Sequence, residues 1–142
     1  MSRDPSCIFC KIVAGEAQAA KVYEDDFSMA FLDLFPAAEG HTLVIPKAHY
    51  ENLFEASEST LPAVWLAARR VARAIHKALA PDGLMVFQLN GAAAGQTVFH
   101  YHAHLVPRAA GSELRLHGRQ QADAARLGAI AARIAAALEA PS

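Results

Sequence analysis

Hydrophobic and polar positions alternate along this chain with two different periods. Between residues 61 and 79 the apolar side chains recur every three or four positions, which predicts an amphipathic helix. Ser59 or Thr60 can cap the start of this helix. Two further segments have helical character, at residues 7–14 and at about residues 120–140. The pattern therefore predicts three helices.

Five shorter segments alternate with period two or are rich in β-branched residues, which predicts β-strands. They cover residues 22–23, 28–34, 42–45, 84–89 and 100–106. Several are joined only by turns, which favours an antiparallel sheet with helices at its sides, an α+β fold. We see no linker, internal repeat or block of like charge, so we expect one domain over residues 1–142.

Composition excludes several classes of protein. Thirteen basic and fourteen acidic residues leave a net charge of −1, which argues against a protein that coats nucleic acid. No apolar run is long enough for a membrane span, and a polar, acid-containing start predicts no signal peptide. Two cysteines are too few for a disulfide scaffold. We therefore expect a cytoplasmic protein with neither a nucleic acid polymer nor a membrane as its partner.

Three of the seven histidines, His100, His102 and His104, are spaced two residues apart. On a strand they would share one face, while the residues between them face the core. Three such imidazoles could be a solvated face, could bind a catalytic metal, or could supply a nucleophile with its helpers. A neutral imidazole is a good nucleophile near pH 7. The glycine-containing loop 90–97 could offer backbone N–H groups to a phosphate.

The two cysteines form the motif Cys7-Ile-Phe-Cys10. This spacing is found in redox pairs and in metal half-sites, and it also occurs among simple buried thiols. No predicted strand precedes it, which disfavours the redox interpretation. A zinc site would need two further ligands from elsewhere in the chain.

These motifs together resemble the histidine triad (HIT) family of nucleotidyl hydrolases and transferases. The segment His100-Tyr-His102-Ala-His104-Leu-Val matches the family motif, in which apolar residues alternate with the histidines. The resemblance also includes Ile8-Phe9-Cys10-Lys11-Ile12, Val22-Tyr23-Glu24-Asp25-Asp26, Ala30-Phe31-Leu32-Asp33 and Gly40-His41-Thr42-Leu43-Val44-Ile45-Pro46-Lys47. It covers about residues 6–108. The helix expected at about 120–140 lies beyond it and is like that of bacterial HIT-like proteins.

The resemblance implies roles for residues throughout the chain. His102 would be the nucleophile that attacks the α-phosphorus of a nucleotide, with His104 and His41 beside it. Contacts to phosphate and ribose would come from Asp33, Asn90, Gln96 and Thr97, and the walls of the base pocket from Phe9, Ile12, Phe31 and Leu34. A structural zinc would be held by Cys7, Cys10, His49 and His100. The remaining histidines, His76 and His117, are expected at the surface.

The resemblance also implies a fold and a reaction. The fold would be the HIT fold, a five-stranded antiparallel sheet with flanking helices, which pairs in a homodimer into a continuous ten-stranded sheet. The substrates would be purine nucleotides, either adenosine phosphoramidates or dinucleoside polyphosphates, with no organic cofactor. Thr97 replaces the serine usual in the phosphoramidase branch, so the branch stays open. Two alternatives are a metal-dependent hydrolase that uses the three triad histidines as ligands and a nucleotide-binding module with weak catalysis.

Overall fold

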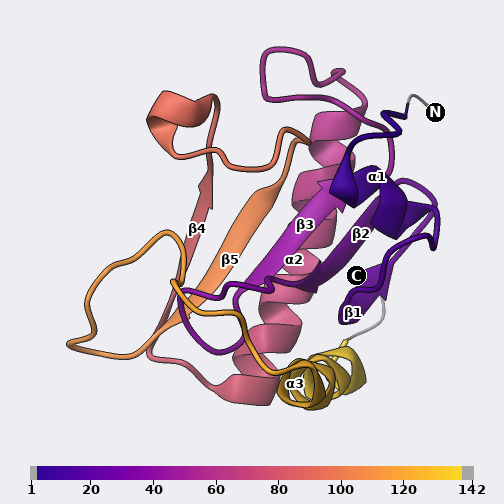
Figure 1. Ribbon diagram of the computed structural model, residues 1–142. Coiled ribbons are helices and arrows are strands. Elements are labelled where there is room, and N and C mark those ends of the chain that lie inside the picture. Colours follow the sequence, from indigo (N-terminus) through magenta and orange to yellow (C-terminus); the bar gives the residue numbers. More distant parts are fainter. Residues whose placement is uncertain (1–2, 139–142) are drawn as a thin grey trace.

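Five antiparallel strands form one sheet in the order β1-β2-β3-β5-β4 (Figure 1). The computed structural model describes residues 3–138. The strands are β1 (Lys21–Glu24), β2 (Ser28–Leu32), β3 (Thr42–Pro46), β4 (Gly83–Gln88) and β5 (Ala103–Arg108). The helices are α1 (Ile8–Val13), α2 (Thr60–Leu79), α3 (Ala124–Ala136) and the short 3₁₀ turn η1 (Ala92–Ala94). The predicted α+β class and the five-stranded antiparallel sheet are confirmed.

The interior strands β2 and β3 are buried on both faces, because helices cover each side of the sheet (Figure 1). Ala30 and Val44 are paired across the strands and face the core beneath α2 and α3. Phe31 and Leu43 are also paired, and they face the smaller core beneath α1. Helix α1 is therefore packed on the sheet face opposite the long helix.

The long helix α2 begins at Thr60, as the hydrophobic stripe predicts, but its capping differs from the expectation. The Ser59 side chain makes no capping hydrogen bond. Instead the Ser57 hydroxyl accepts a 3.2 Å hydrogen bond from the Thr60 amide. The cap lies two residues earlier because Ser59 already has helical backbone angles, which turn its side chain away from the free amides.

The strand predicted over residues 100–106 begins three residues later, at Ala103. The Tyr101 amide donates to the Tyr50 carbonyl at 2.6 Å, outside the sheet ladder. The His100 carbonyl is bonded to the ring of His102 at 2.6 Å. Since these backbone groups are engaged elsewhere, only His104 of the three histidines lies within β5.

The final helix α3 confirms the helical pattern near the end of the chain, and its Ile130 and Ile134 pack in the core. Residues 139 and 140 of the predicted helix lie outside the described residues. Across the segment 3–138, no helix has both the length and the apolar character required to cross a bilayer.

Candidate functional site

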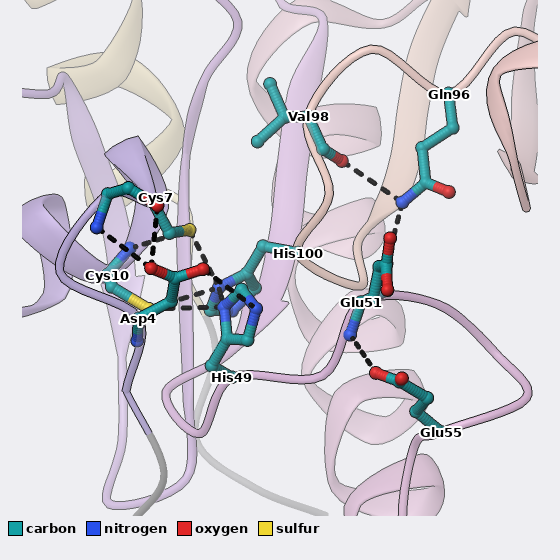
Figure 2. Close-up of polar contacts among 10 residues, drawn as sticks. Asp4, Cys7, Cys10, His49, Glu51, Glu55, Gln96, Val98 and His100 are labelled. Carbon is teal, nitrogen blue, oxygen red and sulfur yellow. Dashed lines mark hydrogen bonds and ion pairs between the residues drawn. The ribbon is translucent and has the colours of Figure 1, made fainter.

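A cluster of two thiols and two imidazoles joins three separate parts of the chain (Figure 2). Cys7 and Cys10 lie at the start of α1, His49 follows β3, and His100 precedes β5. The Cys7 sulfur and the His100 Nδ1 atom are 3.4 Å apart. Cys10 Sγ lies 3.3 Å from His49 Nδ1 and 3.6 Å from His100 Nδ1. The two Nδ1 atoms are 3.2 Å apart. The structure thus brings the four predicted ligands together.

The geometry of this cluster fits a tetrahedral zinc ion. Zinc–sulfur and zinc–nitrogen bonds of about 2.3 and 2.0 Å place neighbouring ligand atoms about 3.3–3.8 Å apart. The observed separations, 3.2–3.6 Å, are close to this range. His100 Nε2 lies 2.8 Å from the Pro46 carbonyl, which can only accept, so Nε2 carries the proton. The unprotonated Nδ1 therefore faces the thiols, which is the arrangement a metal-ligating histidine requires.

Burial sets the protonation of the cluster. Burial lowers the pKa of His100 to about 4, so its ring is neutral at physiological pH. Burial raises the pKa of the Cys7 thiol, because a thiolate in this apolar site lacks solvation. A bound divalent cation reverses that preference by stabilising the thiolate directly.

One ring nitrogen of His102 is hydrogen-bonded to the backbone. Its Nδ1 lies 2.6 Å from the His100 carbonyl oxygen, so Nδ1 carries the proton and donates. Burial lowers the pKa of His102, which keeps the ring neutral near pH 7. In that neutral ring Nε2 is the unprotonated nitrogen. His102 therefore has the protonation state of a nucleophile.

His41 and His104 form a hydrogen-bond chain with a defined direction. The Ala37 amide donates to His41 Nδ1 at 2.9 Å, which leaves the ring proton on Nε2. That N–H donates to His104 Nδ1, also at 2.9 Å. His104 must then carry its proton on Nε2, which is buried and has no partner among residues 3–138. The chain therefore ends in an unused N–H donor.

Burial is also the main cause of the low pKa values in this pair. It lowers the pKa of His41 to about 4 and that of His104 to about 2, and neighbouring histidines lower both further. Both rings are consequently neutral at physiological pH. They act as hydrogen-bond donors and acceptors with little positive charge.

A cavity of about 590 Å³ opens beside these histidines. Its apolar wall includes all four residues predicted for a base pocket, Phe9, Ile12, Phe31 and Leu34. Its polar lining includes Asp33, Thr97, His102 and His104. Burial raises the pKa of Asp33, whose carboxylate accepts a 2.9 Å hydrogen bond from the Phe35 amide. Most of the predicted substrate contacts therefore lie around one cavity.

Gln96 and Asn90 lie elsewhere, inside the loop that precedes the triad. The Gln96 side chain donates to the Glu51 and Val98 carbonyls at 2.7 and 3.1 Å (Figure 2). Its carbonyl accepts from the Gly91 amide at 2.7 Å. Asn90 accepts from the Leu53 amide at 2.8 Å. These side chains hold the loop in shape, and their contact with phosphate stays a prediction.

The backbone donors of this loop are partly used as well. The amides of Ala94 and Gln96 donate to the Gly91 carbonyl, and the Gly95 amide donates to Ala92. The amides of Gly91, Ala94, Gly95 and Gln96 are therefore already used within the loop. The free N–H of His104 and the hydroxyl of Thr97 both belong to residues that line the cavity.

The three triad histidines do not converge on one point. His100 is turned toward Cys7 and Cys10, whereas the rings of His102 and His104 lie 4.7 Å apart beside the cavity. Apart from the cysteine cluster, the part of the chain that the structure describes contains one group with metal-ligand spacing: Asp33, His41 and His104. In that group His41 Nε2 carries the proton donated to His104, so it has no lone pair to offer a cation.

The expectation of a surface role for His117 is wrong. Its ring lines the cavity and lies 5.6 Å from the ring of His104. Periodicity could not place it, because it lies in an irregular connection between β5 and α3. The adjacent Gly118 was the only local indication, since glycine permits close approach to another backbone segment.

Comparison with known proteins gives sequence relatives over most of the chain. The HIT domain model matches residues 14–111. Protein hit of Bacillus subtilis is 50% identical over 103 residues, which are 72% of this chain and 71% of that protein. Adenylylsulfatase HINT3 of Arabidopsis thaliana is 44% identical over 102 residues, which are 72% of this chain and 52% of that protein.

Solved structures agree in fold. A Hit-like protein of Bartonella henselae matches with a TM-score of 0.90 at 42% identity, covering 97% of this chain and 100% of that one. A zinc-bound histidine triad family protein of Mycobacterium smegmatis matches with a TM-score of 0.82 at 39% identity, covering 93% and 92%. On sequence and fold together, this chain belongs to the HIT domain family.

Proposed function

We propose that this protein is a nucleotidyl hydrolase or transferase in which His102 forms a covalent nucleotidyl intermediate. One observation carries the proposal. The His100 carbonyl holds the proton of His102 on Nδ1, which leaves a lone pair on Nε2 in a ring that lines the cavity. Nucleophilic catalysis needs such an unprotonated nitrogen already held in place.

The reaction divides into two steps. His102 Nε2 forms a bond to the α-phosphorus, and the bond from phosphorus to the leaving group breaks. An amine leaving group takes one proton from solvent as it departs. Water then attacks phosphorus, the bond to Nε2 breaks, and one proton returns to solvent. The Nε2–H of His104 has no partner within the described segment but is buried, so it must become accessible before it can donate to a phosphate oxygen and stabilise the charge that develops there.

Substrate binding follows from the two sides of the cavity. The edge-to-face pair Phe9 and Phe31, with ring centroids 5.2 Å apart, forms part of an apolar wall for a purine base. Asp33 accepts hydrogen bonds from ribose hydroxyls. The adenylylsulfatase among the relatives supports an adenylyl group as the part transferred. The substrates are accordingly adenosine phosphoramidates or dinucleoside polyphosphates.

The cysteine cluster would hold a structural zinc through Cys7, Cys10, His49 and His100. The separations of the ligand atoms and the zinc-bound Mycobacterium smegmatis relative support this assignment. When bound, the ion supplies four coordinate bonds that fasten α1 to the sheet. It takes no part in the chemistry at His102.

The protein would act as a homodimer. Strand β4 is at an edge of the sheet, so a second copy can extend the sheet to ten strands. Trp65 and Leu66 on α2 and Val86 on β4 are partly exposed apolar side chains that such an interface could cover. Light scattering of the purified protein measures its mass directly, and a mass of one chain contradicts the homodimer.

Rapid-quench mass spectrometry of the intact protein tests the covalent mechanism. A nucleoside phosphoramidate and a dinucleoside polyphosphate are each mixed with the wild type and with His102→Asn. We expect a transient nucleotidyl adduct in the wild type and none in the variant. Substrate binding with turnover but no adduct, or equal turnover by the two proteins, refutes the mechanism. Binding without turnover in the wild type favours the nucleotide-binding module instead.

A further inference from the structure

The connection between β5 and α3 carries an imidazole into the cavity. His117 shares this cavity with Asp33, His102 and His104. Its ring meets that of His104 edge to face, with centroids 5.6 Å apart and planes at 74°. Its Nε2 lies 3.2 Å from the Gly95 carbonyl oxygen, so Nε2–H donates to the loop that precedes the triad.

The position of His117 is held by its neighbours in the chain. The Gly118 amide donates to the Phe35 carbonyl at 2.9 Å, and the Ala122 amide donates to Leu34 at 2.8 Å. A Cβ atom at Gly118 would come within 2.0 Å of the Pro36 carbonyl oxygen, so only glycine fits there. The segment is therefore docked against the backbone that follows β2, and His117 reaches the cavity for that reason.

His117 influences the pKa values of several titratable groups in the site. Burial is the main cause of the lowered pKa values of His41, His102 and His104, and positive charge on His117 lowers each of them further. Burial raises the pKa of Asp33, and the same charge opposes that rise. His117 is therefore close enough to these four groups to influence their pKa values.

From this geometry we propose that His117 is a positioning residue for the phosphate side of the nucleotide site, where its Nε2–H fixes the loop at Gly95 and its ring packs against His104. The loop residue Thr97 and the donor of His104 then keep a fixed separation across which a phosphate can bind. The inference rests on the proposed nucleotide function, and it adds a residue that the triad motif does not contain.

Comparing AMP with adenosine isolates the phosphate side of the site. Calorimetry with both ligands is carried out on the wild type, His117→Ala and His117→Gln. A glutamine amide can still donate to Gly95, whereas alanine cannot. We expect His117→Ala to weaken AMP binding about 10-fold, the equivalent of one hydrogen bond to a charged ligand. Adenosine binding should be unchanged, and His117→Gln should recover AMP affinity to within about threefold.

Two further variants act as controls. His76→Ala removes an exposed histidine of α2 and should bind AMP as the wild type does. Gly118→Ala displaces the segment while keeping the ring, so it should reproduce the selective loss of AMP affinity. Circular dichroism melting checks that each variant is folded. Should Gly118→Ala fail to fold, the pair His117→Ala and His117→Gln still decides the matter.

The outcomes separate this inference from the proposed function. Equal AMP binding by wild type and His117→Ala overturns the inference alone. Equal losses of affinity for AMP and adenosine also overturn it, because the substitution then does not act on the phosphate side of the site. No recovery of AMP affinity in His117→Gln overturns it as well, because the hydrogen bond to Gly95 is then not the cause. If the wild type binds neither ligand, the proposed nucleotide function falls, and the inference falls with it.

Discussion

His100 and His102 are two residues apart, yet opposite nitrogens of their rings are unprotonated. His100 donates from Nε2 to the Pro46 carbonyl, which leaves Nδ1 facing two sulfurs and a second imidazole. His102 donates from Nδ1 to the His100 carbonyl, which leaves Nε2 in a ring beside the cavity. The His100 nitrogen faces the candidate metal ligands, whereas the His102 ring lines the cavity. The carbonyl partner therefore decides which kind of chemistry each imidazole can perform.

Of the substitutions that separate the roles of His100 and His102, His102→Asn should have the largest effect, which is a loss of turnover. Removal of the proposed nucleophile should lower kcat by at least about 10³-fold. The zinc content and melting temperature should stay close to those of the wild type, because the substituted side chain does not belong to the cysteine cluster. Steady-state kinetics and metal analysis on the same preparation check both halves. A variant that loses zinc along with activity would show that the two clusters are not separable.

The double substitution Cys7→Ser and Cys10→Ser alters the cysteine cluster and leaves His102 in place. Zinc content should fall from about one ion per chain to almost none, because two hydroxyls replace two thiolates. With free zinc at about 1,000 times Kd, the lost stabilisation is about 4 kcal/mol. That corresponds to a fall in melting temperature of about 10 °C for a chain of this size.

Chelator-treated wild type provides the matched control for the double variant. It should melt at the temperature of the variant, and added zinc should restore only the wild type. Differential scanning calorimetry with and without zinc makes this measurement. If neither chelator nor added zinc changes the melting temperature of the wild type, the metal is not structural.

A smaller effect is expected at the ribose side of the cavity, from Asp33→Asn. Loss of the charged acceptor should lower kcat/KM about 10-fold while zinc binding is unaffected. Adenosine and its 2′,3′-dideoxy analogue provide the control ligands. The substitution should reduce the affinity for adenosine and leave that for the dideoxy analogue unchanged. An equal loss for both would place Asp33 away from the ribose.

Asp33 also predicts a dependence of stability on pH. Burial raises the pKa of this carboxyl in the folded protein, so folding disfavours its ionised form. Its contribution to stability is therefore fully present below the ordinary aspartate pKa of about 3.9 and is lost as the pH rises through the raised value. The unfolding free energy of the wild type minus that of Asp33→Asn should increase as the pH falls from 7 to about 4. Urea titrations across this range measure the difference, and a decrease contradicts the assignment.

The smallest effect is expected from Phe9→Leu, which alters the wall between the two clusters. The Phe9 ring lies 5.8 Å from that of His100 and 5.2 Å from that of His102. Leucine keeps an apolar contact, so stability should fall by about 1 kcal/mol, or about 3 °C in melting temperature. Nucleotide affinity should fall a few-fold, and the zinc stoichiometry should stay at one. Thermal melts and calorimetry measure these values, and a loss of zinc would show that the ring supports the metal ligands.

Much of the fold could be predicted from periodicity alone. The stripe along α2 and the β-branched run of β3 both gave elements close to those observed. Period two failed at residues 100–102, where the alternation is present but the backbone bonds leave the sheet ladder for Tyr50 and the His102 ring. Side-chain alternation reports on which residues are buried, and it contains no information about where the backbone hydrogen bonds go.

The candidate site was predictable where its residues belong to a dense local motif. Cys7 and Cys10 are three residues apart, a spacing that allowed a metal half-site, a redox pair or buried thiols, and the resemblance to the HIT family added His49 and His100 as zinc ligands. His117 had no such pattern, because its place depends on Gly118 docking against Pro36, more than 80 residues earlier in the chain. Contacts between distant backbone segments cannot be read from the local order of residues.

Helix α1 has only six residues, and it contributes side chains both to the cysteine cluster and to the cavity. Cys10 belongs to the cysteine cluster, while Ile8, Phe9 and Ile12 line the cavity. A helix this short is not stable alone, so whatever orders it reduces the entropic cost of binding on its other side. If the proposed zinc and nucleotide both bind, thermodynamic linkage requires the metal to tighten nucleotide binding by the same factor by which the nucleotide tightens metal binding. The zinc content of the protein would then rise with the supply of nucleotide, and nucleotide binding would rise with the supply of zinc.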